Sequence, residues 1–291
     1  MPWDPGPVVS ARWLAERIGD ASVRVVDATV HLPDTGRNAR TEYLQGHIPG
    51  AAFFDFELVA DPGNPLPRKC PDRAHFAAMV GALGIGNDTH VVAYDTPGLY
   101  SAARVWWLFR HYGYDKVSIL DGGLKAWCAA GRPVETGEVP APLKDFVPGE
   151  ERGLLARWPR VLDAARADLS QILDARTPGR FSGVEQDRYP GTRAGHIPRS
   201  RNLYWANLLE PETRCLLPEA ILRERFESAG LDYDRPVILT CGSGLTACIL
   251  ALALHLTGKD DWKVYDGSWD EWGRRADLPI EGAPGQSGET P

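Results

Sequence analysis

The feature of this chain that could do chemistry is a cysteine followed by a glycine-rich segment. The segment reads Thr240-Cys-Gly-Ser-Gly-Leu-Thr-Ala247, between a β-branched run and an apolar helical pattern. Two glycines within four residues let the backbone turn tightly and direct N–H groups inward. The following helix adds the positive end of its dipole. Such surroundings favour a thiolate, the nucleophilic form of cysteine. The pattern predicts sulfur or phosphorus chemistry at Cys241.

Two other interpretations of Cys241 have to be weighed. Most free cysteines are small buried apolar side chains, and packing is the default role of Cys248 and of any cysteine without a supporting constellation. A cysteine-dependent phosphatase needs an arginine six residues after the nucleophile, where this chain has Ala247, so we exclude that activity. The remaining cysteines, Cys70, Cys128 and Cys215, form no C-x-x-C pair, so we expect neither a metal site nor a disulfide framework.

Length, composition and net charge narrow the class of protein to which this chain can belong. The chain has 291 residues, 43% of them apolar, and a formal net charge of −7. This length favours two domains. The negative charge argues against nucleic acid or an anionic membrane surface as a partner. No signal peptide is evident, and the longest apolar run, 247–254, is about half of a membrane span. We therefore expect a cytoplasmic protein with reduced thiols.

The chain contains an internal repeat that predicts two similar domains. Three matched pairs of segments recur in the same order, about 145 to 150 residues apart. The pairs are Tyr43-Leu-Gln-Gly-His-Ile-Pro-Gly50 with Arg193-Ala-Gly-His-Ile-Pro198, Val91-Val-Ala-Tyr-Asp95 with Val237-Ile-Leu-Thr-Cys241, and Leu120-Asp-Gly-Gly-Leu-Lys-Ala-Trp127 with Tyr265-Asp-Gly-Ser-Trp-Asp-Glu-Trp272. We predict an N-terminal domain at 1–137, a Pro- and Gly-rich linker at 138–156, a C-terminal domain at 157–282 and a tail at 283–291.

Each half alternates short β-branched runs, which we interpret as buried strands, with helical patterns. The expected strands span 23–27, 91–94, 117–120, 171–174, 237–240 and 263–265. The expected helices span 11–18, 75–83, 101–112, 124–130, 158–167, 218–229, 246–256 and 269–275. This alternation predicts the α/β class, with one parallel sheet per half and helices on both faces. Ligands bind beyond the carboxyl ends of such strands, where Cys241 stands and where the first half has Asp95.

The motifs resemble those of a known family. Tyr43-x-x-x-His-Ile-Pro-Gly-Ala-Ala-Phe53 and Tyr265-Asp-Gly-Ser-Trp-Asp-Glu-Trp272 are similar to the N- and C-terminal signatures of two-domain sulfurtransferases of the rhodanese superfamily. The resemblance covers nearly the whole chain and implies two tandem rhodanese-like domains. In this family only the C-terminal domain is catalytic, which agrees with Asp95 at the position of the nucleophile.

The loop also resembles that of one subfamily. Cys241-Gly-Ser-Gly-Leu-Thr-Ala247 is similar to the 3-mercaptopyruvate sulfurtransferase loop Cys-Gly-Ser-Gly-Val-Thr-Ala. Thiosulfate enzymes carry Cys-Arg-Lys-Gly-Val-Thr, whose two cations suit a doubly charged donor. The resemblance implies a Cys241 persulfide that receives sulfur from 3-mercaptopyruvate, releases pyruvate and passes the sulfur to a thiol, thioredoxin or cyanide, with no cofactor. The alternatives are a thiosulfate:cyanide sulfurtransferase and a non-enzymatic persulfide carrier.

The resemblance also implies the residues that surround Cys241. Ser243 is expected to hydrogen-bond the substrate or relay a proton, and the rest of the loop to bind substrate through Gly242, Gly244, Leu245 and Thr246. Arg180, in Gly179-Arg-Phe181, matches an arginine that holds the substrate carboxylate, a task suited to the forked guanidinium. The second arginine of the family falls at Tyr189 here, and Arg188 stands one residue early. Either residue could contact the substrate.

Two residues of the first half are the last candidates. Glu57 occupies the position of an acid that the subfamily is thought to place near the loop serine, and Arg68 stands where a histidine is expected. Arg68 would then act as a fixed positive charge for the anionic substrate or the enolate. The alternative is an ordinary surface ion pair. His47 and His196 lie in the repeated segment, so we interpret both as structural.

Overall fold

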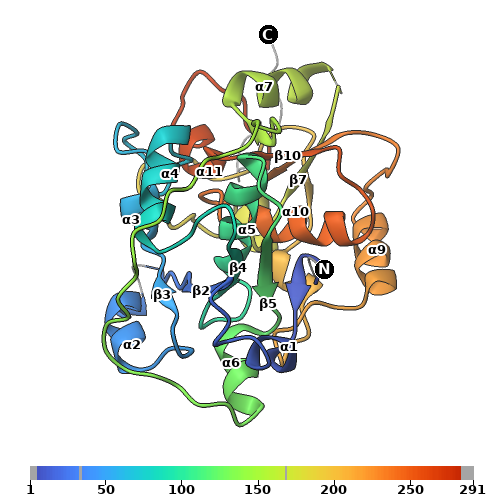
Figure 1. The fold of residues 1–291 in the computed structure, drawn as a ribbon. Helices are drawn as coiled ribbons and strands as arrows, with labels where there is room; N and C mark the ends of the chain where they lie inside the picture. The colour runs from blue at the N-terminus through green and yellow to red at the C-terminus, as the bar shows by residue number, and fades with distance from the viewer. Residues whose placement is uncertain (1–4, 33–34, 168, 283–291) are drawn as a thin grey trace. The chain divides into compact units, whose positions relative to one another are not determined.

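The computed structural model describes residues 5–32, 35–167 and 169–282 (Figure 1), and the chain divides into two compact units. The first unit comprises the described residues of Met1–Arg152 together with Leu209–Leu216. The second comprises those of Gly153–Leu208 and Leu217–Pro291. The domain limits expected from the sequence remain our proposal, and the expected tail at 283–291 lies outside the described residues.

The first unit is built on a parallel sheet. Within its described residues, five strands pair in the order β1-β5-β4-β2-β3. The strands are β1 (Val8–Val9), β2 (Val23–Asp27), β3 (Ala52–Phe53), β4 (His90–Tyr94) and β5 (Val117–Leu120). The helices are α1 (Ala11–Ala15), α2 (Ala39–Gln45), α3 (Phe56–Val59), α4 (Arg73–Ala82), α5 (Ala102–His111) and α6 (Gly123–Ala129).

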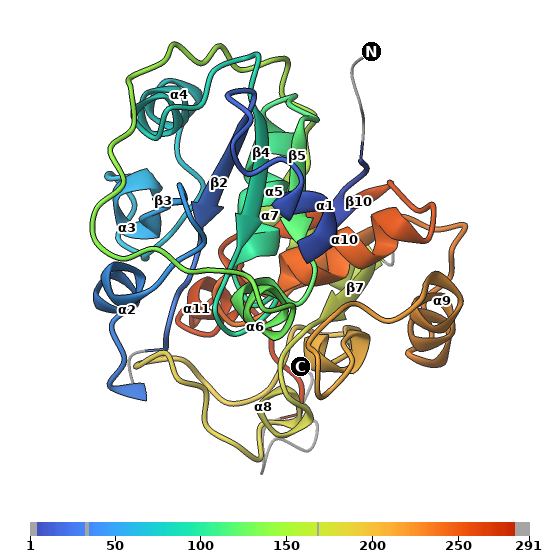
Figure 2. The ribbon, with the colours of Figure 1, turned by 60° about the horizontal axis from the view of Figure 1, so that its bottom comes forward.

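The second unit repeats this topology. Its described residues form five parallel strands in the order β6-β10-β9-β7-β8, so β9 takes the place that β4 has in the first unit. The strands are β6 (Leu155–Ala156), β7 (Gln171–Asp174), β8 (Arg201–Asn202), β9 (Val237–Thr240) and β10 (Trp262–Tyr265). The helices are α7 (Trp158–Ala167), α8 (Pro178–Ser182), the 3-10 turn η2 (Trp205–Leu208), α9 (Glu219–Ser228), α10 (Ala247–Leu256) and α11 (Ser268–Trp272). Figure 2 shows several of these elements from a second direction.

Helices cover both faces of the second sheet, as the repeat of strands and helices predicts. Ile172 and Ile238 point to one face, where they pack in a buried cluster with Val161 of α7 and Trp269 of α11. Successive side chains of a strand alternate between faces. Leu173 and Leu239, which follow these isoleucines, therefore point to the other face, where α10 packs on β9 and β10. Because β7 and β9 are buried along their whole length, both strands are held firmly in the sheet. The sheet therefore fixes the positions of the residues that follow each strand.

The long elements follow the sequence prediction closely and the short ones do not. The helix expected at 158–167 and the strands expected at 171–174 and 237–240 have those bounds. The helix expected at 11–18 stops at Ala15, and that expected at 269–275 ends at Trp272. The two-residue edge strands and the four- to seven-residue helices α2, α3 and α8 were missed, because segments of that length carry no measurable hydrophobic period.

The apolar run that begins at Ala247 is an internal helix. Its first eight residues, Ala247–Leu254, are fully buried, and α10 as a whole has ten residues. A helix that is apolar on all sides belongs inside a protein core. In the part of the chain that the structure describes, no helix is long and apolar enough to cross a membrane.

Candidate active site

Cys241 lies immediately after β9, in the loop that leads into α10. Its side chain is buried, with 1% of the residue exposed. The Gly244 N–H donates a hydrogen bond to the Cys241 sulfur at 3.1 Å, so the loop does turn an amide toward the thiol. An N–H donor stabilises negative charge that develops on an acceptor in a site closed to water. This hydrogen bond is the kind of contact that the predicted thiolate requires, and the catalytic role of Cys241 remains a prediction.

Gly244 is required by the shape of this loop. Its φ angle is +91°, in the region that residues with a Cβ rarely adopt. A Cβ on Gly244 would also lie 2.8 Å from the carbonyl oxygen of Asp266. Both the backbone conformation and the close approach of the chain after β10 therefore exclude a side chain, and both aim the Gly244 amide at the sulfur.

Ser268 lies beside Cys241 and was missed by the sequence analysis. Its hydroxyl accepts a hydrogen bond from the Cys241 N–H at 3.2 Å, donates to the Tyr265 carbonyl at 2.8 Å, and is 3.9 Å from the Cys241 sulfur. Ser268 has a φ angle of +51°, and the matching residue of the first unit is Gly123, with φ +57°. A residue with a Cβ in this left-handed conformation costs about 1–2 kcal/mol of conformational free energy. The serine at a position where the first half has glycine was the sequence signal that could have identified Ser268.

The start of α11 holds the loop from the other side. The Trp269 N–H donates to the Cys241 carbonyl at 3.0 Å, and the Asp270 N–H donates to the Gly242 carbonyl at 2.8 Å. Ser243, Leu245 and Thr246 are buried within the loop, and Thr246 is the N-cap residue of α10. The expected roles of these side chains remain predictions.

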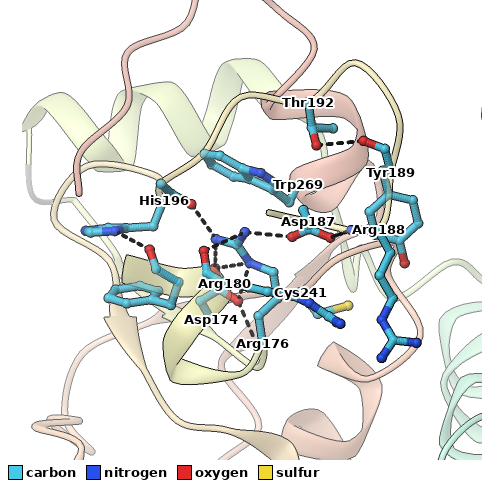
Figure 3. Close-up of polar contacts among 12 residues, drawn as sticks. Asp174, Arg176, Arg180, Asp187, Arg188, Tyr189, Thr192, His196, Cys241 and Trp269 are labelled. Atoms are coloured by element: carbon cyan, nitrogen blue, oxygen red, sulfur yellow. Dashed lines mark hydrogen bonds and ion pairs between the residues drawn. The ribbon is translucent and has the colours of Figure 1, made fainter. Parts of the chain in front are cut away.

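Arg180 lies on α8, just beyond the carboxyl end of β7. Because Asp174 pairs with Thr240 across neighbouring strands, the segments after β7 and β9 share one edge of the sheet (Figure 3). Arg180 is half-buried, its Nε is buried, and its guanidinium forms no hydrogen bond or ion pair with the described residues. A buried cationic donor without a protein partner is costly, so this group suits an anionic ligand.

Arg176 is the second residue that the sequence analysis missed. Although burial opposes its charge, the carboxylates of Asp174 and Asp187 raise the pKa of its guanidinium. Arg176 contacts Asp174 at 2.8 Å and Asp187 at 2.9 Å, and lies over the Trp269 ring at 4.4 Å (Figure 3). All three polar side chains are almost fully buried, so Arg176 fixes the segment that carries Arg188 and Tyr189 to the end of β7.

Arg188 and Tyr189 differ in their relation to the loop. The Arg188 N–H donates to the Asp187 carboxylate at 2.7 Å, and its side chain is exposed. Tyr189 is half-buried, and its ring lies against Gly242. Of the two candidates left open by the sequence, the structure brings Tyr189 to the loop, while a substrate contact of Arg188 stays a prediction.

Glu57 and Arg68 belong to the first unit and pair with each other. Arg68 Nη1 is 3.4 Å from Glu57 Oε1, with 14% and 63% of their side chains exposed. A pair with one exposed member contributes about 0–1 kcal/mol. This geometry fits the alternative of an ordinary ion pair, and an action on the substrate stays a prediction.

The histidines of the repeat pack structurally. His196 Nδ1 is 2.8 Å from the Phe181 carbonyl and its ring stacks on Phe181. His47 is fully buried, with Nδ1 2.7 Å from the Tyr43 carbonyl and its ring on Tyr43. Cys248 is buried in α10, and its thiol donates to the Gly244 carbonyl at 3.3 Å.

Asp95 fills the matching position of the first unit. One oxygen of its fully buried carboxylate accepts hydrogen bonds from the N–H groups of Tyr100, Ser101 and Ala102 at 2.7–2.8 Å. Burial raises the pKa of Asp95, and these amide bonds act against that increase. The first loop is thus closed around its own carboxylate, which has no sulfur to transfer.

The comparison with protein families decides the identity of the fold. The rhodanese-like domain matches residues 10–130 and again residues 159–275. The chain belongs to the rhodanese family. Its two parallel sheets are accordingly two rhodanese-like domains, and Cys241 lies in the second of them.

Relatives of this rhodanese protein include proteins named for 3-mercaptopyruvate, for thiosulfate and for both donors. A 3-mercaptopyruvate sulfurtransferase of Escherichia coli K12 is 41% identical over 94% of this chain and 97% of its own. The human protein of that name is 41% identical over 92% of each chain. A thiosulfate sulfurtransferase of Cricetulus griseus is 42% identical over 97% of each chain. Overall identity therefore does not separate the two donors.

Solved structures agree with the two-domain rhodanese architecture. The crystal structure of Escherichia coli SseA, described as a 3-mercaptopyruvate sulfotransferase with the rhodanese fold, superposes with a TM-score of 0.83 at 39% identity and covers 91% of this chain and 99% of its own. Tum1 of Saccharomyces cerevisiae superposes with a TM-score of 0.87 at 26% identity, over 97% of this chain and all of its own.

Ser268→Ala is expected to weaken both stability and catalysis. The change leaves the buried Cys241 N–H without its acceptor, which costs about 1–3 kcal/mol of unfolding free energy. It also loosens the backbone that places the sulfur, so kcat should fall about tenfold. Chemical denaturation and steady-state kinetics measure the two effects.

Ser200→Ala is the control. Ser200 donates a similar hydrogen bond to the Ile197 carbonyl just before β8, at the amino ends of the strands, whereas Cys241 follows a carboxyl end. Equal effects of the two changes would contradict a role for Ser268 in the site.

Proposed function

We propose that this chain is a sulfurtransferase that moves sulfur from 3-mercaptopyruvate to a thiol or cyanide through a persulfide on Cys241. The observation that carries the proposal is the hydrogen bond of 3.1 Å from the Gly244 N–H to the Cys241 sulfur at the end of β9. Arg180, a half-buried arginine whose guanidinium has no hydrogen-bond or ion-pair partner among the described residues, follows the neighbouring strand and supports a donor that carries a carboxylate.

The reaction divides into two transfers at sulfur. In the first, the Cys241 thiolate attacks the donor sulfur, an S–S bond forms, and the C–S bond of 3-mercaptopyruvate breaks. Its electron pair goes to the pyruvate enolate, which takes up a proton. In the second, the acceptor thiolate or cyanide attacks the outer sulfur, and the S–S bond breaks to return the Cys241 thiolate. We assign Arg180 to the donor carboxylate and Ser243 to the hydrogen bond or proton relay near the enolate.

The Asp95 loop of the first unit suggests how the Cys241 loop would hold the outer sulfur of a persulfide. In Asp95 the carboxylate oxygen stands one bond beyond Cγ, as the outer sulfur of a persulfide stands one bond beyond Sγ. The Asp95 oxygen accepts from the N–H groups of Tyr100 and Ser101. By the repeat, the amides of Thr246 and Ala247 at the start of α10 would receive the outer sulfur of the Cys241 persulfide.

The loop favours 3-mercaptopyruvate over thiosulfate as the donor. Gly242 and Ser243 offer no positive charge next to Cys241, whereas a doubly charged inorganic anion is best held by cations. Thiosulfate remains the second candidate, because one relative that is 42% identical carries that name. We also propose thioredoxin as an acceptor and the cytoplasm as the location, since a thiol acceptor must be in its reduced form.

The donor is identified by two measurements on the full chain. Incubation with 3-mercaptopyruvate is expected to add one sulfur to the peptide that contains Cys241, as mass spectrometry detects, with release of pyruvate. The value of kcat/KM for 3-mercaptopyruvate should exceed that for thiosulfate. A higher value for thiosulfate would overturn the choice of donor, and a persulfide at another cysteine would overturn the assignment of the nucleophile.

A further inference from the structure

The two glycines of the Cys241 loop are present for different reasons. Gly244 has φ +91°, so its backbone conformation already demands glycine. Gly242 is not among the residues with a positive φ angle, so its backbone would accept an ordinary side chain. The backbone conformation therefore does not account for the glycine at position 242, whereas the space around it does.

One side chain occupies that space. A Cβ built on Gly242 would lie 2.6 Å from Cε2, 3.0 Å from the hydroxyl oxygen and 3.2 Å from Cζ of Tyr189, and these are its three nearest atoms. Carbon atoms that are not bonded meet at about 3.5–4.0 Å. The outer end of the Tyr189 ring thus fills the volume into which any side chain at position 242 would begin.

The backbone that carries Tyr189 is held on both sides. On one side, the buried carboxylate of Asp187 pairs with Arg176 at 2.9 Å. On the other, Thr192 donates to the Tyr189 carbonyl from its hydroxyl at 2.8 Å and from its N–H at 3.2 Å (Figure 3). Arg193 then reaches the carbonyls of Arg275 and Leu278 beyond α11 at 2.6 and 2.8 Å. The backbone of this segment cannot move away from a new side chain at Gly242 without breaking such contacts, so the Tyr189 ring itself would have to turn aside.

We propose that Tyr189 determines the donor specificity of this enzyme by excluding side chains at position 242. Only glycine at position 242 fits beneath the ring, so no cationic side chain can follow Cys241 directly, and the donor must be recognised by its carboxylate at Arg180. The proposal rests on the proposed sulfurtransferase function and names the residue that narrows it to carboxylate donors.

The test is a set of double substitutions assayed with both donors. Gly242→Ala should lower kcat/KM for 3-mercaptopyruvate at least tenfold, and the second change Tyr189→Leu, which ends the side chain before Cε2, should restore it to within about threefold of Tyr189→Leu alone. Tyr189→Phe is the matched control, because it keeps the ring and should not rescue Gly242→Ala. Gly242→Arg should raise kcat/KM for thiosulfate at least tenfold more when combined with Tyr189→Leu than when Tyr189 is present.

The outcomes distinguish a failure of the role proposed for Tyr189 from a failure of the proposed sulfurtransferase function. Full activity of Gly242→Ala, equal rescue by the leucine and phenylalanine variants, or an effect of Gly242→Arg on thiosulfate that is independent of residue 189 would each overturn the role of Tyr189. A wild-type chain that forms no persulfide from 3-mercaptopyruvate would instead overturn the proposed function. Thermal unfolding of every variant identifies one that does not fold, and Tyr189→Val, which also lacks the Cε2 atom, then replaces Tyr189→Leu.

Discussion

Cys241→Ser is expected to abolish sulfur transfer while leaving the fold intact. The serine hydroxyl has nearly the same size and can accept the Gly244 N–H, so the loop keeps its hydrogen bond. A hydroxyl at neutral pH is a far weaker nucleophile than a thiolate, and its oxygen cannot form a persulfide. We expect kcat to fall by at least about 10³-fold with either donor, together with the complete loss of the added sulfur in the mass spectrum.

The control for this change is Cys128→Ser. Cys128 is an exposed free cysteine on α6 of the first unit. Its replacement removes one thiol from the chain, as Cys241→Ser does, but should leave kcat and the persulfide unchanged. Residual turnover of Cys241→Ser near the wild-type rate, or loss of activity in Cys128→Ser, would contradict the mechanism. Circular dichroism of both variants separates loss of chemistry from loss of structure.

Arg180→Gln should produce the second largest effect. The substitution removes the half-buried cation that we assign to the donor carboxylate, and a hydrogen bond to a charged group contributes about 1.5–3 kcal/mol. The value of kcat/KM for 3-mercaptopyruvate is therefore expected to fall about 10²-fold. Most of the loss should appear in KM, because the carboxylate is bound alike before and during the reaction. The kcat/KM of Arg180→Lys should lie between that of the wild type and that of Arg180→Gln, since lysine keeps the charge and loses the planar fork.

Arg166→Gln provides the matched control for Arg180. Arg166 is exposed in the last turn of α7, which leads into the amino end of β7, and Arg180 follows the carboxyl end of that strand. Both changes remove one positive charge from the second unit. Steady-state kinetics with varied 3-mercaptopyruvate should show the KM increase only in the Arg180 variants. An unchanged KM in Arg180→Gln would assign the carboxylate to another residue.

The sequence predicted the nucleophile because several local signals coincide at Cys241. A buried strand, two glycines and an apolar helix follow one another directly, and the internal repeat places Asp95 at the matching position. Each signal depends on residues within a few positions of the cysteine. The parallel order of the long strands follows from the same kind of local alternation, since each strand is buried on both faces.

Residues that act through distant contacts were not predictable in this way. Arg176 pairs with Asp187 and packs on Trp269, and Ser268 meets Cys241 from the end of a different strand. Such contacts depend on which strands are neighbours in the sheet. The sequence offered a hint only at Ser268, where the repeat has glycine in the first half and serine in the second.

By itself the sequence determined the repeated α/β fold and the family and predicted the nucleophile, because these depend on short segments and on their order along the chain. The tertiary structure decided which side chains approach the sulfur. It assigned Tyr189 rather than Arg188 to the face of the loop, and within the described part of the chain it gave the Arg180 guanidinium no hydrogen-bond or ion-pair partner. The physical reason is that occupied space and the pairing of buried charges depend on segments far apart in the chain, and they are set only when the ends of β7, β9 and β10 meet at one edge of the sheet.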